Sequence, residues 1–115
     1  MITNIELKDV LKVTITSCNI TAEEYRDTYR TIDQFADYTK EVIKSGNLSL
    51  ACECFSTANY LLSEGNREIK ILIENVYIAS LSTFLNINAT FARQVKNLLP
   101  ARLLDLFKKR INGIF

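Results

Sequence analysis

The residues most able to carry chemistry lie near the middle of the chain, in the run Glu74-Asn75-Val76-Tyr77. A carboxylate, an amide and a phenol this close together could line a polar pocket, with Glu74 as a general acid or base. Glu74 also follows Lys70 by four residues, so a surface ion pair on a helix explains the same carboxylate without a substrate. Glu74, Asn75 and Tyr77 are therefore candidate pocket residues, and we expect Asn75 to be buried.

Side chains on which most enzymes and metal sites depend are absent or scattered. The chain has no histidine, which removes the commonest general base and the commonest metal ligand. Its 3 cysteines, Cys18, Cys52 and Cys54, show no repeated spacing, so neither a disulfide framework nor a zinc site is expected. With only 3 glycines, a glycine-rich phosphate loop is excluded. We expect no enzyme, no cofactor and no metal.

The C-terminal part of the chain is basic. Residues 93–110 contain six Lys and Arg against one acid, Asp105. Three of these bases stand together at residues 108–110, where the dipole of a helix end favours positive charge in any case. A structural role is thus preferred over nucleic-acid binding, which would need bases spread along a face with interleaved aromatic residues.

Two tyrosines, Tyr38 and Tyr60, fall off the expected buried stripes. Partly exposed tyrosines are good anchors of protein interfaces, although a tyrosine can also lie at the edge of a core with its hydroxyl in water. Together with the bases, they give the candidate interface residues Tyr38, Tyr60, Arg102, Lys109 and Arg110.

Length and composition define the class of protein. The chain has 115 residues, 48% hydrophobic and 23% charged, with a net charge of +1, which fits one domain with its own core. With 3 Gly and 1 Pro it has too few turn residues for a sandwich or barrel. The charge-free window at residues 75–92 is too short and polar to span a bilayer, and residues 1–6 do not resemble a signal peptide. A cytoplasmic protein without membrane contact is expected.

Apolar spacing and capping residues predict an all-α fold, an antiparallel array of about five helices around a central apolar helix. Residues 1–20 form an N-terminal segment, and 21–115 form a single helical domain. Gly46-Asn47 and Gly65-Asn66 should each end one helix and cap the next. The predicted helices cover residues 21–45, 48–64, 67–85, 89–99 (capped by Asn88) and 100–111, and 67–85 is the central one.

The N-terminal segment fits two patterns. Ile5, Val10 and Leu11 could form one face of a helix, whereas Leu11, Val13 and Ile15 alternate with polar residues as in a strand. A strand without a partner in its own chain would favour pairing in a two-fold dimer. Both alternatives stay open.

Residues 46–111 resemble a known family. Gly65-Asn66 leads a helix that carries Ile73-Glu74-Asn75-Val76-Tyr77, and Leu98-Leu99-Pro100 precedes a terminal amphipathic helix. These features are similar to a family of small, uncharacterised all-helical bacterial proteins. The resemblance implies the fold and a bacterial source, transfers no activity or site residue, and leaves out the first 20 residues.

These observations favour a non-enzymatic protein-interaction module, whose partner is another protein or a second copy of this chain. The alternative is a small-molecule-binding domain or minor enzyme with a pocket at Glu74, Asn75 and Tyr77. Nucleic-acid binding through the basic C-terminal helix ranks third.

Overall fold

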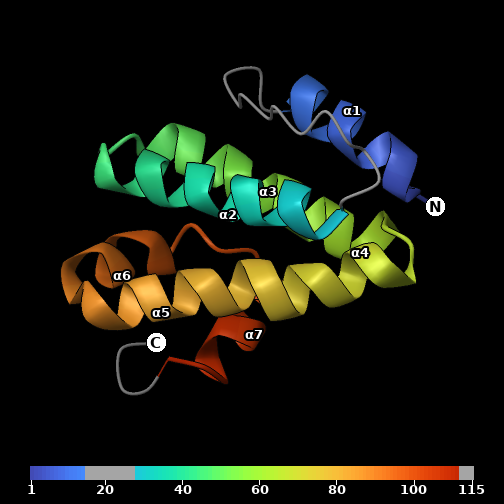
Figure 1. Ribbon diagram of the computed structural model, residues 1–115. Coiled ribbons are helices and arrows are strands. Elements are labelled where there is room, and N and C mark those ends of the chain that lie inside the picture. Colours follow the sequence, from blue (N-terminus) through green and yellow to red (C-terminus); the bar gives the residue numbers. More distant parts are fainter. Residues whose placement is uncertain (15–27, 112–115) are drawn as a thin grey trace.

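The computed structural model describes residues 1–14 and 28–111, and this part of the chain is all-α. Three consecutive elements, α4, η1 and α5, form one long helix that lies between the α2–α3 pair and α7 (Figure 1). The predicted helical array around a central helix is confirmed. In chain order the elements are α1 (Asn4–Thr14), α2 (Thr28–Lys44), α3 (Leu48–Glu64), α4 (Arg67–Leu72), η1 (Ile73–Ile78), α5 (Ala79–Ile87), α6 (Ala89–Lys96) and α7 (Ala101–Lys108).

The long central helix contains a π-helical stretch, η1, which the sequence did not predict. A π-turn closes hydrogen bonds between residues five apart instead of four. Because each turn is wider, the neighbouring residues Tyr77 and Ile78 are both fully buried. The central helix contacts α2, α3, α6 and α7, so most of its surface is covered, as expected for the most apolar stretch of the chain.

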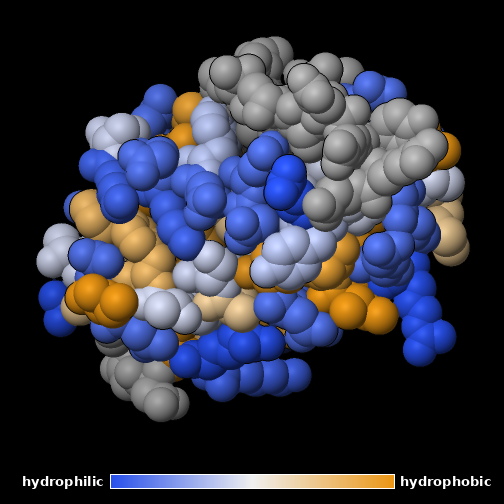
Figure 2. Space-filling model, viewed as in Figure 1, coloured by the Kyte–Doolittle hydropathy of each residue, from blue (hydrophilic) through white to orange (hydrophobic). Residues whose placement is uncertain are grey.

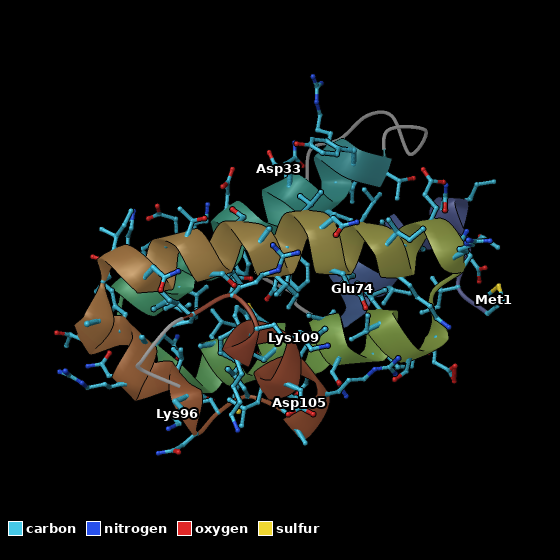
Figure 3. All side chains as sticks on the ribbon, turned by 90° about the horizontal axis from the view of Figure 1, so that it is seen from below. Met1, Asp33, Glu74, Lys96, Asp105 and Lys109 are labelled. Carbon is cyan, nitrogen blue, oxygen red and sulfur yellow. The ribbon has the colours of Figure 1, made fainter. Side chains whose placement is uncertain are left out.

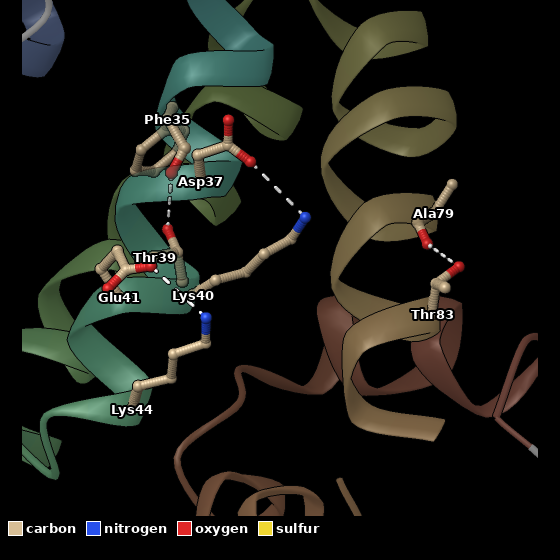
Figure 4. Close-up of polar contacts among 8 residues, drawn as sticks. All are labelled: Phe35, Asp37, Thr39, Lys40, Glu41, Lys44, Ala79 and Thr83. Atoms are coloured by element: carbon tan, nitrogen blue, oxygen red, sulfur yellow. Dashed lines mark hydrogen bonds and ion pairs between the residues drawn. The ribbon is translucent and has the colours of Figure 1, made fainter. Parts of the chain in front are cut away.

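Tyr77 lies at the centre of the core. Its ring stacks on Phe35 of α2 with 4.7 Å between ring centroids. The Thr39 hydroxyl donates to the Phe35 carbonyl oxygen at 2.9 Å (Figure 4) and lies 3.0 Å from the Tyr77 hydroxyl. Because Thr39 donates its hydroxyl proton to the Phe35 carbonyl oxygen, the Tyr77 hydroxyl is the donor in the bond between Tyr77 and Thr39. The phenol is thus both packed and hydrogen-bonded inside the fold.

Both Gly-Asn junctions are confirmed. Gly46 ends α2 with a φ of +78°, a left-handed conformation that glycine adopts without strain. The Asn47 side chain accepts the Leu50 N–H at 3.1 Å, and the Asn66 side chain accepts the Ile69 N–H at 2.9 Å. Each asparagine therefore satisfies one of the free N–H groups at the start of the next helix.

The later junctions differ from the prediction. Asn88 is the N-cap residue of α6, as predicted, but its side chain makes no capping hydrogen bond there; its amide donates instead to the Phe84 carbonyl oxygen at 2.9 Å, at the end of α5. Pro100 directly precedes α7, which ends at Lys108 rather than near residue 111. Ile111, just beyond the helix, is still buried with 2% exposure.

Residues 4–14 are helical, which decides between helix and strand for this part of the chain. Leu7 and Leu11 are buried, and α1 contacts α2 and α3. Ile2 forms a parallel bridge with Gly65: its N–H donates to the Glu64 carbonyl at 2.7 Å, and its carbonyl accepts the Asn66 N–H at 2.8 Å. The argument for a dimer from an unpaired strand therefore has no basis in the described residues. The predicted helix start at Thr21 and the third cysteine, Cys18, lie outside them.

A capping box starts α1, and it gives a first testable prediction. Glu6 accepts from the Thr3 hydroxyl at 2.9 Å and from the Thr3 N–H at 3.1 Å. These two hydrogen bonds, the side-chain one first, lower the pKa of Glu6 below its usual value. Their stabilisation is therefore present above the ordinary carboxyl pKa and is lost as the pH falls through the lowered one.

We expect Glu6→Gln to lower the melting temperature more at about pH 7 than at about pH 3, because the stabilisation by the carboxylate falls once the pH drops below the ordinary carboxyl pKa. Thr3→Ala, which removes the cap itself, should cost about 1 kcal/mol. Thermal unfolding followed by circular dichroism at both pH values measures this. An equal effect of Glu6→Gln at the two pH values would contradict the role of the carboxylate.

The outer face of α2 is polar, as predicted. Lys40 pairs with Asp37 at 3.5 Å and Lys44 pairs with Glu41 at 3.4 Å (Figure 4). Figure 2 shows hydrophilic side chains gathered over α2, with hydrophobic ones in a band below them. Tyr29 is 58% exposed, because the buried stripe of α2 follows Thr28, Phe35 and Thr39 and Tyr29 lies beside it. Among the described residues, no helix has the length and hydrophobicity needed to cross a membrane.

Candidate functional site

A pocket of about 440 Å³ lies between η1 and α7. Glu74 and Ile78 of η1 line one side of it, Leu106 of α7 lines the other, and Lys109 and Arg110 follow directly after α7. Figure 3 shows Glu74 and Lys109 on the same underside of the molecule, beside α7. The pocket thus combines residues from two elements that lie more than 25 positions apart in the chain.

Packing of α7 positions the two bases. Leu103 and Phe107 are fully buried and attach α7 to the core. Beyond the helix, the Arg110 N–H and the Ile111 N–H both donate to the Phe107 carbonyl oxygen, at 2.9 and 2.8 Å. Ile111 is buried as well, so the segment that carries Lys109 and Arg110 is held at both ends.

Arg110 is also tied to the central helix by two long hydrogen bonds. Its guanidinium Nη2 donates to the Glu74 carbonyl oxygen at 3.4 Å, and its own carbonyl oxygen accepts from the Asn86 amide at 3.3 Å. The guanidinium therefore lies beside the backbone of the residue that supplies the carboxylate. One positive side chain and the residue that carries the negative one therefore lie next to each other on the pocket wall.

The charges of the pocket are available to a ligand. Among the described residues, ion pairs join Lys40 to Asp37 and Lys44 to Glu41, but none joins Glu74 to Lys109 or Arg110. No group of three His, Cys, Asp or Glu side chains in residues 1–14 and 28–111 could hold a metal ion. What the arrangement can do is bind a polar ligand through one carboxylate, one ammonium and one guanidinium, with an apolar surface beside them.

Of the three predicted pocket residues, only Glu74 lines this pocket. Asn75 is exposed, contrary to the expectation of burial, because it lies four residues after the exposed Ile71 and continues the same outer stripe of the helix. Tyr77 is fully buried and faces Phe35 and Thr39. Its phenol therefore serves the core and does not face the pocket.

Three of the five predicted interface residues lie on α7 or directly after it. Lys109 and Arg110 line the pocket, and Arg102, in the first turn of α7, donates to the Ser63 hydroxyl at 3.4 Å. Tyr60 lies three residues before Ser63 on α3 and is 48% exposed. Tyr38 does not join them: it belongs to α2, is half-buried and packs against the core.

Two pocket residues, Ile78 and Leu106, were missed by the sequence analysis. Both are aliphatic residues on amphipathic stretches, where hydrophobic spacing indicates only a core position. No motif distinguishes them from their buried neighbours. Only the packing of α7 across η1 makes them part of a pocket.

Comparisons with known proteins identify a family. No curated protein and no solved structure shows significant similarity to this chain. One family profile, described as "Domain of unknown function (DUF7674)", matches residues 7–113. The match extends well beyond the resemblance at residues 46–111 and takes in most of α1, which the sequence analysis placed outside it. The chain therefore belongs to the family described as a domain of unknown function, DUF7674.

Proposed function

We propose that this chain is a non-enzymatic protein-interaction module that binds an acidic segment of a partner protein. The binding site is the α7 surface, which we define as Tyr60, Arg102, Lys109 and Arg110. The observation that carries the proposal is the hydrogen bond from Arg102 of α7 to Ser63 of α3, which brings the exposed bases of α7 next to the end of α3 that carries the exposed Tyr60.

The charge of this surface supports an acidic partner. Arg102, Lys108, Lys109 and Arg110 are exposed bases, and Asp105 is the one acid on α7. A patch of one sign accelerates association with a surface of the opposite sign and disfavours other partners. Tyr60 adds a large, rigid side chain of the kind that anchors protein interfaces.

A non-enzymatic role is supported by the residue types available. Histidine is absent, and the pocket at η1 contains a single carboxylate, whereas acid–base catalysis by carboxylates commonly uses two.

A cytoplasmic location and a bacterial source belong to the same proposal and rest on the sequence features given above. A second copy of this chain remains one candidate partner, which native mass spectrometry of the purified protein would detect.

Charge reversal tests the proposal. The double variant Arg102→Glu/Lys109→Glu should reduce capture of the partner from an extract of the source organism at least about tenfold, because two favourable interactions become repulsive. Both side chains are exposed, so the circular dichroism spectrum and melting temperature should change little. Quantitative mass spectrometry of the captured proteins gives the ratio of variant to wild type.

Lys44→Glu is the matched control, since it reverses an exposed charge on α2 and should leave capture unchanged. The captured protein is then purified, and its acidic segment is changed to lysines. Binding to the double variant should be restored in this swapped pair. Equal capture by wild type and double variant, or capture of nucleic acid that nuclease removes, would contradict the proposal.

One observation favours a second candidate function, binding of a small molecule. The pocket at η1 contains Glu74, which the sequence had singled out, together with Lys109 and Arg110. Its volume of about 440 Å³ lies within the range of small-ligand sites in proteins.

A further inference from the structure

We infer that the pocket between η1 and α7 binds a free α-amino acid with an aliphatic side chain. This inference deepens the small-molecule candidate above and does not depend on the proposed protein partner. It uses every residue that lines the pocket: one acid, two bases and two aliphatic side chains.

The charges select a zwitterion. A ligand that carries only negative charge would be repelled by Glu74, and one that carries only positive charge would be repelled by Lys109 and Arg110. An α-amino acid carries a carboxylate and an ammonium group on the same carbon. Its carboxylate can bind the two bases while its ammonium group binds Glu74. Each charged side chain of the pocket then faces a ligand group of opposite charge.

The Arg110 guanidinium lies beside the backbone of Glu74 and keeps free donors for a ligand. One N–H of its guanidinium donates to the Glu74 carbonyl oxygen at 3.4 Å, which leaves most of its five donors for a ligand. The guanidinium thus lies beside the residue whose side chain is the carboxylate. A ligand that binds both residues must present its carboxylate and its ammonium group within this one pocket, as a free amino acid does and the separate ends of a long peptide do not.

The apolar part of the pocket selects the side chain. Leu106 is half-buried on α7, and Ile78 lies fully buried behind the pocket wall. A branched aliphatic side chain placed against Leu106 would remove its own apolar surface and part of that of Leu106 from water. Leucine is therefore the probe that we choose for the test.

The test uses the full chain labelled with ¹⁵N and three probes: L-leucine, N-acetyl-L-leucine and L-leucinamide. The two derivatives each lack one charge of the amino acid. Leucine should shift the backbone amide signals of Glu74, Ile78, Leu106, Lys109 and Arg110 and bind at least about fivefold more tightly than either derivative.

Three outcomes with the wild-type chain would overturn the inference. Equal binding of N-acetyl-leucine and leucine would show a simple anion site, and equal binding of leucinamide and leucine would show a cation site. The absence of any shift at the five residues up to the solubility of leucine would show that there is no site. All three outcomes are measured on the wild-type chain, so they do not depend on whether any variant folds.

Variants sharpen the assignment of charges. Glu74→Gln and Arg110→Gln should each weaken leucine binding about fivefold or more, and Glu74→Gln should also make leucine and N-acetyl-leucine equivalent. Arg93→Gln is the matched control, because Arg93 is an exposed base on α6 that does not line the pocket, and it should leave leucine binding unchanged. Loss of leucine binding with Arg93→Gln would contradict the pocket assignment. Failure of the leucine titration would leave capture of a protein partner unaffected, so the two proposals fail separately.

Discussion

Replacement of Phe35 by alanine is expected to lower the free energy of unfolding by about 3–5 kcal/mol. Phe35 is fully buried, and its ring stacks on Tyr77 with centroids 4.7 Å apart. The substitution removes this contact and leaves a cavity between α2 and η1, at the centre of the core. Urea unfolding monitored by far-ultraviolet circular dichroism measures the change. Because small domains are stable by only about 5–15 kcal/mol, this loss is a large fraction of the total stability.

Tyr77→Phe is the matched control at the same contact. It keeps the stacked ring and removes only the hydroxyl that lies 3.0 Å from Thr39. Thr39 still donates to the Phe35 carbonyl oxygen, so the expected cost is about 1 kcal/mol. A Phe35→Ala variant no less stable than Tyr77→Phe would show that the stacked pair is not the centre of the core.

Gly65→Ala is expected to cost about 2–3 kcal/mol. A Cβ atom at Gly65 would lie 2.5 Å from the Leu61 carbonyl oxygen and 2.6 Å from Cγ2 of Ile69. Neither can move freely, because the Leu61 oxygen accepts the Gly65 N–H at 2.8 Å and Ile69 is fully buried. The junction between α3 and α4 must therefore shift, and with it the backbone bridge to Ile2. Urea unfolding gives the cost, and hydrogen exchange of the Ile2 N–H should become faster.

Gly46→Ala separates this steric effect from a backbone effect. Gly46 has a φ of +78°, and a Cβ atom there would meet nothing within 4 Å. Its substitution should therefore cost only the strain of a left-handed residue, about 1 kcal/mol. If Gly46→Ala were as costly as Gly65→Ala, close packing at Gly65 would not be the reason that glycine is needed.

Local signals predicted most of the fold. Gly46-Asn47 and Gly65-Asn66 end and cap helices through contacts within a few residues, so the sequence alone indicates them. Thr3 and Glu6 form the capping box of α1 and are also a local signal. The alternation of apolar and polar residues around Leu11, which is typical of a strand, pointed the other way. The π-turn η1, which packs against α2 and α7, is marked by no capping or turn residue in the sequence.

The site could be predicted only in parts. The sequence assigned Glu74 to a pocket but Lys109 and Arg110 to a separate interface. It could not group the three residues, because sequence spacing relates only residues that are near each other in the chain. The structure joins them in one pocket, since α7 packs across η1. The partial burial of Tyr38 could not be predicted for the same reason. It depends on contacts with other helices, which the apolar spacing within its own helix does not show.

The most direct test of the proposed function is photo-crosslinking in the source organism from position 60. The variant Tyr60→p-benzoylphenylalanine should form a crosslink to one protein, within an acidic segment, and the crosslink should be lost when Arg102→Glu and Lys109→Glu are added. Tyr29→p-benzoylphenylalanine is the control, because Tyr29 is more exposed than Tyr60 but lies on α2. Crosslinks of the same pattern from both positions, or from position 60 regardless of the charge reversals, would contradict binding at the α7 surface.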